Sequence, residues 1–529
     1  MSRRIWRNIW RLTLCLACVA PAQAQLDRDW KIFVVPFSHV DVGYTASVET
    51  VVQQHSTYLD SVVAYVERYK SNPENSRFRW STEVSWQLEN YLATRSPDQI
   101  ERFMGLVREG YIEINAMYLS LQTDLCGPEE LVRSLYYSDR IARDYDVGIG
   151  PAVTNDTPGF TWGLAQLLER AQVPYFSLAM NSALSDFYTT TDIPNLFFWE
   201  AQSGHRTLVW RSIHTQWAYL EGAVWGVYGG YSLMENRITN LLNQLANAGY
   251  PYDFVLINAA TGDNGAPNPN IVNNAQAWND NHAGSEMRVA TFSDFFYHAS
   301  YESGARETIP VYSGDAPNWW SLWFASSASR GHLTSRRAQA LLPAAETAAS
   351  IASVLDPSFD YPAEALDRAY NDNLLYEDHN MGAANNAPAD NQAFWELKMG
   401  WVTNALNAAQ EVFEAGIDSW AAQIETQGGH EIAVFNVLPW TRSEVVRIDP
   451  DHPLLAEVRA FEIIDDETGE DVAHQRLSTG EVAFLADSVP SLGYRTFRIA
   501  EHSGPIVAPA PLHGNVLENA LYRIEVGET

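Results

Sequence analysis

Short apolar runs alternate with longer amphipathic stretches from residue 29 to about residue 324. The first run, residues 32–35, lies in the segment KIFVVPFSHVDVGYT and is typical of a buried strand. Strands interleaved with helices predict an α/β domain built on seven parallel strands, as an open sheet or as a seven-stranded, barrel-like one. The other six strands are predicted at 78–81, 111–114, 151–154, 175–178, 208–210 and 254–257. Helices are predicted at 48–70, 86–92, 128–143 and 160–171, and one more after a capping signature at Ser96.

Two later changes of pattern predict further domains. Ala- and Leu-rich stretches of helical period at 336–355, 363–372 and 391–415 predict a three-helix bundle. Short β-branched and aromatic runs separated by turns then predict the start of an antiparallel β-sandwich. We therefore expect an α/β catalytic domain at 25–329, a helical bundle at 330–424 and a β-sandwich at 425–529. Because the chain ends inside a predicted strand at 521–526, we expect the sequence to be truncated.

The charge balance excludes two classes of partner. The 529 residues include 65 acidic and 34 basic ones, which gives a net charge of −31. Such a surface repels nucleic acid and anionic membranes, so we expect neither as a partner. Only Cys126 lies beyond the first two dozen residues, so we expect no internal disulfide and no cysteine cluster for zinc. Any metal would be held by histidines and carboxylates.

Residues 1–24 have the pattern of a signal peptide. A basic start is followed by an apolar run at 12–20 and by the small-x-small cleavage signal Ala22-Gln23-Ala24. The run is too short to span a membrane, and no other stretch is predicted to do so. We therefore expect a periplasmic or secreted protein. A lipoprotein cleaved before Cys18 is disfavoured, because the residues before that cysteine match such a signal poorly.

Four stretches carry candidate chemical groups. His39 and Asp41 follow the first strand, and they share one face if the extended conformation continues to Asp41, which makes half of a divalent-metal site. Asp156 follows a strand in Asn155-Asp156-Thr157-Pro158-Gly159, Asp263 lies in Gly262-Asp263-Asn264-Gly265, and His379 lies in Tyr376-Glu377-Asp378-His379. Each also has an ordinary interpretation as a chance pair, a helix cap, a turn residue or a solvated loop histidine.

As an ordered set, these motifs resemble glycoside hydrolase family 38, the zinc-dependent α-mannosidases. The H-x-D of the first strand, a D-x-x-G element after a later strand and a histidine in an acidic motif all occur in the family's order. Residues 110–113, 122–133 and 433–440 add supporting similarity. The family commonly has Trp or a similar residue where Tyr44 stands. Because this chain departs from the family there, we expect its substrates to be α-mannosides or related α-glycosides, and not α-mannosides alone.

The resemblance implies roles for individual residues. One Zn²⁺ would be held by His39, Asp41, Asp156 and His379, and Asp156 would also be the nucleophile. Asp263 is our candidate for the general acid/base, with Asp315 as the second choice. The residues expected to contact substrate are Tyr44, Trp162, Asp315 and Trp319, with Trp320 and Trp323 as further candidates for stacking on sugar.

The implied reaction is hydrolysis with retention of configuration. A retaining mechanism predicts that the carboxyl groups of Asp156 and Asp263 lie about 5–5.5 Å apart, whereas about 9 Å would indicate inversion. The partner would be an oligosaccharide or glycoconjugate, and the oligomeric state stays open. Two alternatives remain: a metal-dependent polysaccharide deacetylase, although the sequence lacks its paired histidines, and a non-catalytic carbohydrate-binding relative, although no ligand is missing.

Overall fold

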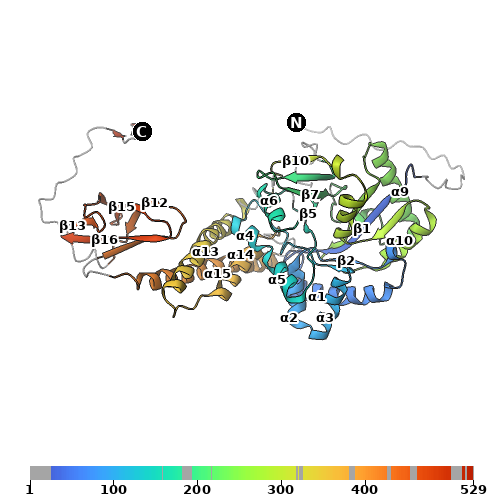
Figure 1. The fold of residues 1–529 in the computed structure, drawn as a ribbon, viewed down its shortest axis with the longest axis horizontal. Coiled ribbons are helices and arrows are strands. Elements are labelled where there is room, and N and C mark those ends of the chain that lie inside the picture. The colour runs from blue at the N-terminus through green and yellow to red at the C-terminus, as the bar shows by residue number, and fades with distance from the viewer. Residues whose placement is uncertain are drawn as a thin grey trace. The chain divides into compact units, whose positions relative to one another are not determined.

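The computed structural model describes residues 26–157, 159–181, 194–215, 217–316, 320, 326–380, 388–425, 431–452, 461–501, 515–518 and 521–527. The chain divides into two compact units, one made of Met1–Ala340 with Asp367–Asn407 and one made of Leu341–Leu366 with Ala408–Thr529. The predicted signal peptide and two of the predicted sugar-stacking residues, Trp319 and Trp323, lie outside the described residues. Figure 1 shows the ribbon and its labels.

Strand β1, Lys31–His39, is the central strand of a parallel sheet with the order β8-β1-β9. Its neighbours are β8, Phe254–Asp263, and β9, Glu286–Val289. Every residue of β1 except Lys31 is buried, as expected for a parallel strand that is covered on both faces. Each large apolar side chain buried there stabilises the fold by about 1.5–3 kcal/mol. The β1–β8 ladder ends by aligning His39 with Asp263.

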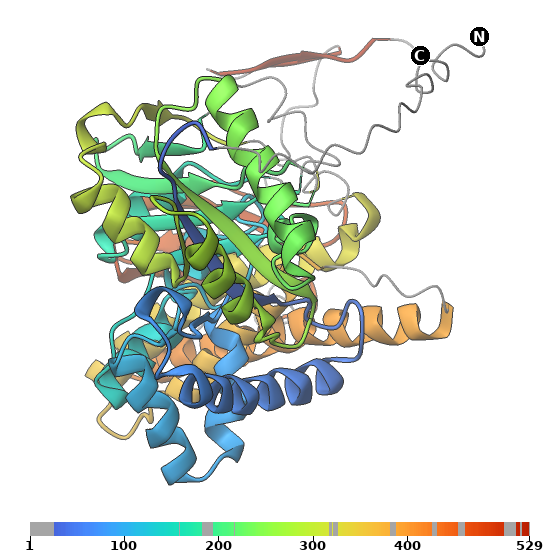
Figure 2. The same ribbon diagram turned by 90° about the vertical axis from the view of Figure 1, so that its right-hand side faces the viewer.

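Helices cover this sheet. Buried residues of α9, Tyr231–Asn247, and α10, Asn270–Asn281, belong to the same hydrophobic cluster as β1, β8 and β9 (Figures 1 and 2). The remaining α-helices among the described residues before residue 320 are α1 Val48–Tyr69, α2 Glu89–Thr94, α3 Pro97–Arg108, α4 Pro128–Arg133, α5 Tyr136–Tyr145, α6 Gly163–Arg170, α8 Glu221–Val224 and α11 Phe292–Tyr297.

Two helix predictions illustrate success and failure. The capping signature at Ser96 is confirmed: its side chain accepts the N–H of Gln99, and the Gln99 side chain accepts the N–H of Ser96. The single helix predicted at 128–143 is wrong, because α4 and α5 are separate. The carbonyl of Ser134 accepts the N–H of Tyr118 (2.8 Å) instead of continuing the helical ladder, so a contact distant in sequence interrupts the helix.

A second sheet has the order β10-β6-β7-β5-β4. Its strands are β4 Ala152–Asn155, β5 Tyr175–Ala179, β6 Leu196–Glu200, β7 Arg206–Arg211 and β10 Val311–Ser313, and β2 Trp80–Ser81 pairs separately with β3 Ile112–Glu113. All seven predicted strands are present, and the described pairs among them are parallel. The unpredicted β6 is antiparallel to β7, so the sheet is mixed. The fold is therefore mixed α/β, and closure into a seven-stranded barrel stays a prediction.

Three long helices follow: α13 Ser329–Leu355, α14 Ala363–Glu377 and α15 Pro388–Ala421. The predicted helical stretches are confirmed, whereas the three-helix bundle as a separate domain stays a prediction. Among the described helices, α13 alone is long and apolar enough to cross a membrane, judged by length and composition. That is weak evidence for a span, and 33% of its most apolar window is buried within the protein.

The last part of the chain forms antiparallel sheets of order β11-β16-β13 and β12-β15-β14. One hydrophobic cluster contains residues of both sheets, including Ile463, Phe497 and Phe484. The strands are β11 Glu431–Asn436, β12 Arg442–Ile448, β13 Phe461–Asp465, β14 His474–Arg476, β15 Val482–Val489 and β16 Gly493–Glu501, followed by the pair β17 Val516–Glu518 and β18 Arg523–Glu525.

Candidate metal and catalytic site

The carboxyl end of β1 carries the first two candidate ligands. We expected an extended strand as far as Asp41, but β1 ends at His39 and Asp41 lies in the turn that follows. Asn264 holds this turn: its side chain accepts the N–H of Asp41 (3.2 Å) and donates to the carbonyl of Asp41 (3.1 Å). The two side chains therefore meet because of a contact from Asn264, the residue that follows β8, and not because of strand periodicity.

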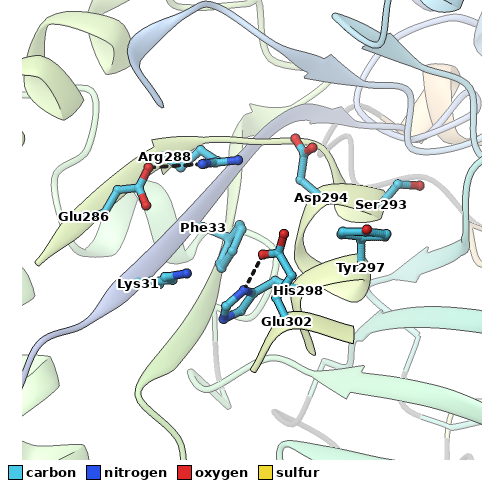
Figure 3. Close-up of a pocket in the computed structure, with 9 residues that line it drawn as sticks. All are labelled: Lys31, Phe33, Glu286, Arg288, Ser293, Asp294, Tyr297, His298 and Glu302. Atoms are coloured by element: carbon cyan, nitrogen blue, oxygen red, sulfur yellow. Dashed lines mark hydrogen bonds and ion pairs between the residues drawn. The ribbon is translucent and has the colours of Figure 1, made fainter. Parts of the chain in front are cut away.

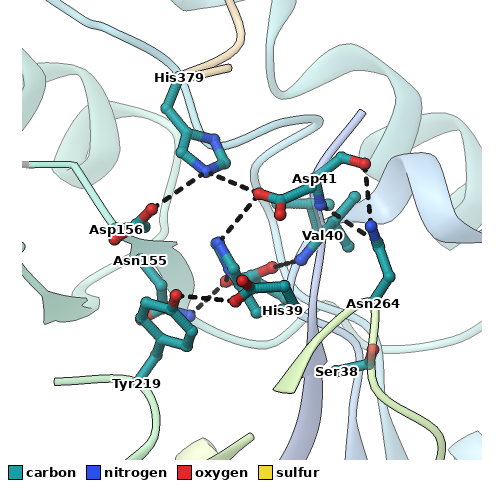
Figure 4. A network of polar contacts seen from close by, with 12 residues as sticks. Ser38, His39, Val40, Asp41, Asn155, Asp156, Tyr219, Asn264 and His379 are labelled. Carbon is teal, nitrogen blue, oxygen red and sulfur yellow. Dashed lines mark hydrogen bonds and ion pairs between the residues drawn. The ribbon is translucent and has the colours of Figure 1, made fainter. Parts of the chain in front are cut away.

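Three ligand-type side chains converge in the first unit (Figure 4). Nε2 of His39 and Nε2 of His379 each lie 3.5 Å from Oδ1 of Asp41. All three residues are buried, and one ligand atom from each lies within 4.8 Å of the others. A nitrogen, nitrogen and oxygen donor set of this kind suits zinc. The structure thus brings together residues that are 340 positions apart in the sequence.

Two further carboxylates orient the imidazoles. Glu83 accepts from Nδ1 of His39 (2.8 Å) and from the N–H of Val40 (2.6 Å). Asp378 lies 3.2 Å from Nδ1 of His379. A carboxylate on one ring nitrogen of a histidine leaves the other nitrogen to face a metal. Both Nε2 atoms accordingly point toward Asp41 (Figure 4).

Backbone pairing attaches the segment of His379 to the α/β part of the same unit. The N–H of His379 donates to the carbonyl of Ser120 (2.8 Å), and the N–H of Gln122 donates to the carbonyl of Glu377 (3.0 Å). Asn380 then donates to Oδ1 of Asp41 (2.6 Å), and Lys398 of α15 donates to the carbonyl of Asn380. Burial lowers the pKa of Lys398 to about 8.

Asp156 lies beside the three ligands. It follows β4 with a left-handed backbone (φ 61°), and its N–H donates to the carbonyl of Ala179 (2.9 Å). Oδ2 lies 3.9 Å from Nε2 of His379, and Oδ1 accepts from Asn181 (2.7 Å). Burial raises the pKa of Asp156. The four residues predicted to hold metal are therefore neighbours, and Asp156 is the most accessible of them, with 16% of its side chain exposed.

Asp263 is exposed at the end of β8 and is contacted by Tyr219. The hydroxyl of Tyr219 donates to Oδ1 of Asp263 (2.8 Å), and its ring centroid lies 4.2 Å from that of His39. Burial and the nearby carboxylates of Asp156 and Asp263 raise the pKa of Tyr219, so the hydroxyl retains its proton for donation. Tyr219 thereby connects the candidate acid/base with a candidate metal ligand.

The predicted substrate-contacting residues occupy two places. Burial and the charges of Asp41, Asp156 and Asp263 raise the pKa of Tyr44, so Tyr44 is close to the candidate site. Asp315, the second choice for the acid/base, accepts the N–H of Trp162 at the start of α6 (2.6 Å). The indole of Trp162 donates to the carbonyl of Glu200 (2.7 Å). Their contact with substrate stays a prediction.

The residues present fit a divalent cation. Nε2 of His39 is buried without a hydrogen-bond partner, which is costly unless something binds there. Burial favours the neutral form of His39 and of His379, yet the surrounding carboxylates raise the pKa of both, that of His379 to about 10. Burial opposes ionisation of Asp41, but the two imidazoles lower its pKa. Four acids, Asp41, Glu83, Asp156 and Asp378, thus surround the two imidazoles and call for positive charge at the centre of the group.

Sequence analysis missed several of these residues. Glu83 follows the short strand β2, so an acid at the carboxyl end of a parallel strand was the available signal. Asp378 and Asn380 flank a residue that was found, yet nothing in the sequence distinguishes them from solvated loop residues. Tyr219 follows neither a motif nor a predicted strand, and only the structure reveals it.

Comparison with known proteins agrees with this arrangement. Residues 29–315, more than half of the chain, match the sequence model of the glycosyl hydrolases family 38 N-terminal domain. Over 115 residues the chain is 33% identical to Alpha-mannosidase 2 of Arabidopsis thaliana, which is 21% of this chain and 8% of that protein.

Solved structures share the fold. An alpha-mannosidase from Enterococcus faecalis V583 has a TM-score of 0.67 at 15% identity and is matched over 94% of this chain and 60% of its own. A family 38 glycosyl hydrolase from Enterococcus faecalis has a TM-score of 0.63 at 16% identity, over 94% of this chain and 58% of its own. The chain thus spans about three fifths of these structures. Their fold is that of glycoside hydrolases, and the family match is decisive: the chain belongs to glycosyl hydrolases family 38.

Proposed function

We propose that the protein is a zinc-dependent, retaining glycoside hydrolase that cleaves terminal α-mannosides or related α-glycosides. The observation that supports this most strongly is the buried cluster of His39, Asp41 and His379, with Asp156 3.9 Å from His379. A zinc ion held by these four residues would supply ligand positions for two adjacent sugar hydroxyls and Lewis-acid polarisation. The neutral surface of a sugar is compatible with the strong negative charge of the chain, unlike a nucleic acid.

In the proposed reaction, two carboxyl groups share the chemistry. A carboxylate oxygen of Asp156 attacks the anomeric carbon, and the bond from that carbon to the leaving oxygen breaks as Asp263 protonates it. Asp263 then takes a proton from water, whose oxygen displaces Asp156 from the anomeric carbon. Tyr219 holds the Asp263 carboxyl group during both steps through its 2.8 Å hydrogen bond.

A panel of aryl α-glycosides, with full-length protein and with and without a chelator, tests substrate and metal together. We expect cleavage of the mannoside, loss of activity when zinc is removed, and recovery when zinc is restored. Activity that survives verified removal of the metal contradicts the zinc proposal. Cleavage of another α-glycoside in place of the mannoside contradicts the sugar assignment alone.

The nucleophile is tested by Asp156→Ala. We expect activity to fall by at least about 10³-fold and azide to restore part of it by forming a glycosyl azide of opposite anomeric configuration. Asp139→Ala, which removes an exposed acid of α5 paired with Arg143, is the matched control and should keep full activity. A first-formed product of inverted configuration, observed by NMR, excludes Asp156 as nucleophile.

We also propose that the protein is exported. The support is the signal-peptide pattern of residues 1–24. N-terminal sequencing of protein from the periplasm or culture medium should begin at Gln25. A lipid-modified amino terminus at Cys18 would instead identify a lipoprotein.

A further inference from the structure

A pocket shown in Figure 3 lies at the amino-terminal end of β1, whereas the candidate catalytic site lies at the carboxyl end of that strand. Its floor is formed by the amino-terminal residues of β1 and β9, where Lys31 and Glu286 are register partners. The volume is about 240 Å³, just below the range of roughly 300–1,000 Å³ for drug-sized ligands. The pocket therefore suits one small ring. It is lined by Lys31, Phe33, Glu286, Arg288, Ser293, Asp294, Tyr297, His298 and Glu302.

One exposed tyrosine lines this pocket, and a second exposed tyrosine packs against the first. Tyr297 lines it and is 57% exposed, and Tyr301, one turn later, is 65% exposed. Their ring centroids are 5.3 Å apart. Single exposed apolar side chains are normal on protein surfaces, whereas adjacent ones that form a patch can mark a binding site. The pair offers a rigid apolar surface with a polar tip.

The backbone beneath the tyrosines is unusual. Residues His298–Glu302 form a π-helical turn directly after α11, and the N–H of Ser303 donates to the carbonyl of His298 (2.9 Å). Such turns are rare and are frequent at functional sites. The turn begins directly after Tyr297 and contains Tyr301, so it sets how the two rings are presented.

The polar wall combines donors and acceptors that already balance one another. Glu286 accepts from Arg288 (3.2 Å), and Glu302 accepts from Nδ1 of His298 (2.9 Å). Asp294 accepts the N–H of Thr291 (2.9 Å). Because each acid already has a partner, a cation gains little there, and three carboxylates repel an anion. A neutral ligand with many hydroxyls can both donate to these acids and accept from the basic groups.

We propose that this pocket and the two tyrosines bind a neutral hexose unit of a glycan, away from the place where a glycosidic bond is cleaved. The sugar's C–H face packs on Tyr297 and Tyr301, while its hydroxyls bond with the charged groups of the wall. Strand β1 has nine residues from Lys31 to His39, and its eight steps of about 3.3 Å put this site about 26 Å from the metal ligands. Such a site retains a long glycan near the enzyme between cleavage events.

The test is affinity electrophoresis of the full-length protein in gels that contain soluble mannan, with Asp156→Ala to prevent its consumption. The choice of mannan rests on the proposed function, so hydrolysis of an aryl α-mannoside is measured separately. We expect the Asp156→Ala protein to be retarded, and the added pair Tyr297→Ala and Tyr301→Ala to weaken binding at least fivefold. Tyr136→Ala, which removes another exposed tyrosine, is the control and should leave retardation unchanged.

The outcomes separate the two proposals. In the otherwise unmodified protein, the double tyrosine variant should keep kcat/KM on the small mannoside within twofold but lose activity on mannan. In the electrophoresis, the second site is overturned if retardation persists when both tyrosine changes are added to Asp156→Ala. It is also overturned if the Asp156→Ala protein itself is not retarded. If the parent is retarded through these tyrosines but no mannoside is cleaved, the sugar-binding site stands and the proposed hydrolysis fails.

Discussion

His39 and Asp263 are register partners at the carboxyl ends of the parallel strands β1 and β8. A backbone ladder therefore places a candidate metal ligand and the candidate acid/base side by side. Asn264 reinforces this, because its N–H donates to the carbonyl of His39 (2.8 Å) while its side chain holds Asp41. The spacing between the backbone positions of His39 and Asp263 is thus determined by the pairing of β1 with β8.

The contact between Tyr219 and Asp263 yields the first prediction. Tyr219→Phe removes the hydroxyl that positions the Asp263 carboxyl group, so we expect kcat/KM to fall about 10–100-fold on substrates with a poor leaving group. Substrates whose leaving group needs no proton, such as dinitrophenyl glycosides, should be affected much less in bond cleavage. Steady-state kinetics over a series of leaving groups measures the difference.

The control for this prediction is Tyr228→Phe. Tyr228 also donates its hydroxyl to β8, at the carbonyl of Ala259, but it does not contact Asp263. It should show no dependence on the leaving group. An equal loss on all leaving groups in Tyr219→Phe would show that the hydroxyl serves the fold and not the acid.

The second prediction concerns Glu83, which bonds Nδ1 of His39. Glu83→Gln preserves the shape of the side chain but weakens the orientation of the imidazole, so zinc affinity should fall about 10–100-fold. Competition with a zinc-binding dye measures this without reference to catalysis. Glu89→Gln, which alters an acid bonded to Tyr118, is the matched control. Unchanged zinc affinity in Glu83→Gln would contradict the assigned role.

How far the sequence predicted this site depended on the kind of signal. Residues at strand ends, such as His39 and Asp156, were found because an apolar run predicts a strand and the polar residue after the run marks the carboxyl end of that strand. The position of His379 follows from backbone pairing with residues near Ser120, which no local pattern reveals; only the order of motifs across the family indicated it. Of the groups that orient the ligands, Glu83 follows the short strand β2 and could have been found in the same way, whereas Asp378 carries no pattern of its own.

The fold shows the same division. Short apolar runs predicted seven strands, because a parallel strand that is buried on both faces leaves a continuous apolar signal. The polar strand β9, Glu286–Val289, was missed because Glu286 and Arg288 alternate with apolar residues over only four positions. The antiparallel β6 was missed although Leu196–Trp199 is apolar, and its direction depends on the short connection to β7.

The third prediction separates backbone from side chain at Asn264. Its φ of 50° favours glycine, so Asn264→Gly keeps the turn accessible but removes the amide that bonds Asp41. We expect a loss of about 1–3 kcal/mol in stability, because the Asp41 N–H is left buried without its partner. Asn264→Ala should lose about 1 kcal/mol more through the left-handed backbone. Urea unfolding measures both, and equal stability of the two variants would contradict the strain.

The last prediction is a pH dependence that originates at His55. Its Nε2 bonds Oδ1 of Asn264 (2.9 Å) and its Nδ1 bonds the amide of Gln87 (2.9 Å), so both ring nitrogens are satisfied in the neutral form. Burial lowers the pKa of His55 from 6.5 to about 4. The unfolded chain therefore takes up a proton below pH 6.5, whereas the folded chain does so only near pH 4. Stability contributed by His55 is fully present above pH 6.5 and is lost as the pH falls to 4, by about 3 kcal/mol.

His55→Gln isolates this contribution, because the glutamine amide can still donate to Asn264 but does not titrate. The measurement is the urea midpoint of wild type and variant at pH 8 and at pH 4. At pH 8 both side chains are neutral, so that difference reports only the packing change. Carboxylates titrate equally in the two proteins, so they do not contribute to the difference. Between pH 8 and pH 4 the wild type should therefore lose more stability than His55→Gln. An identical pH dependence in the two proteins would show that His55 is not held neutral in the folded chain.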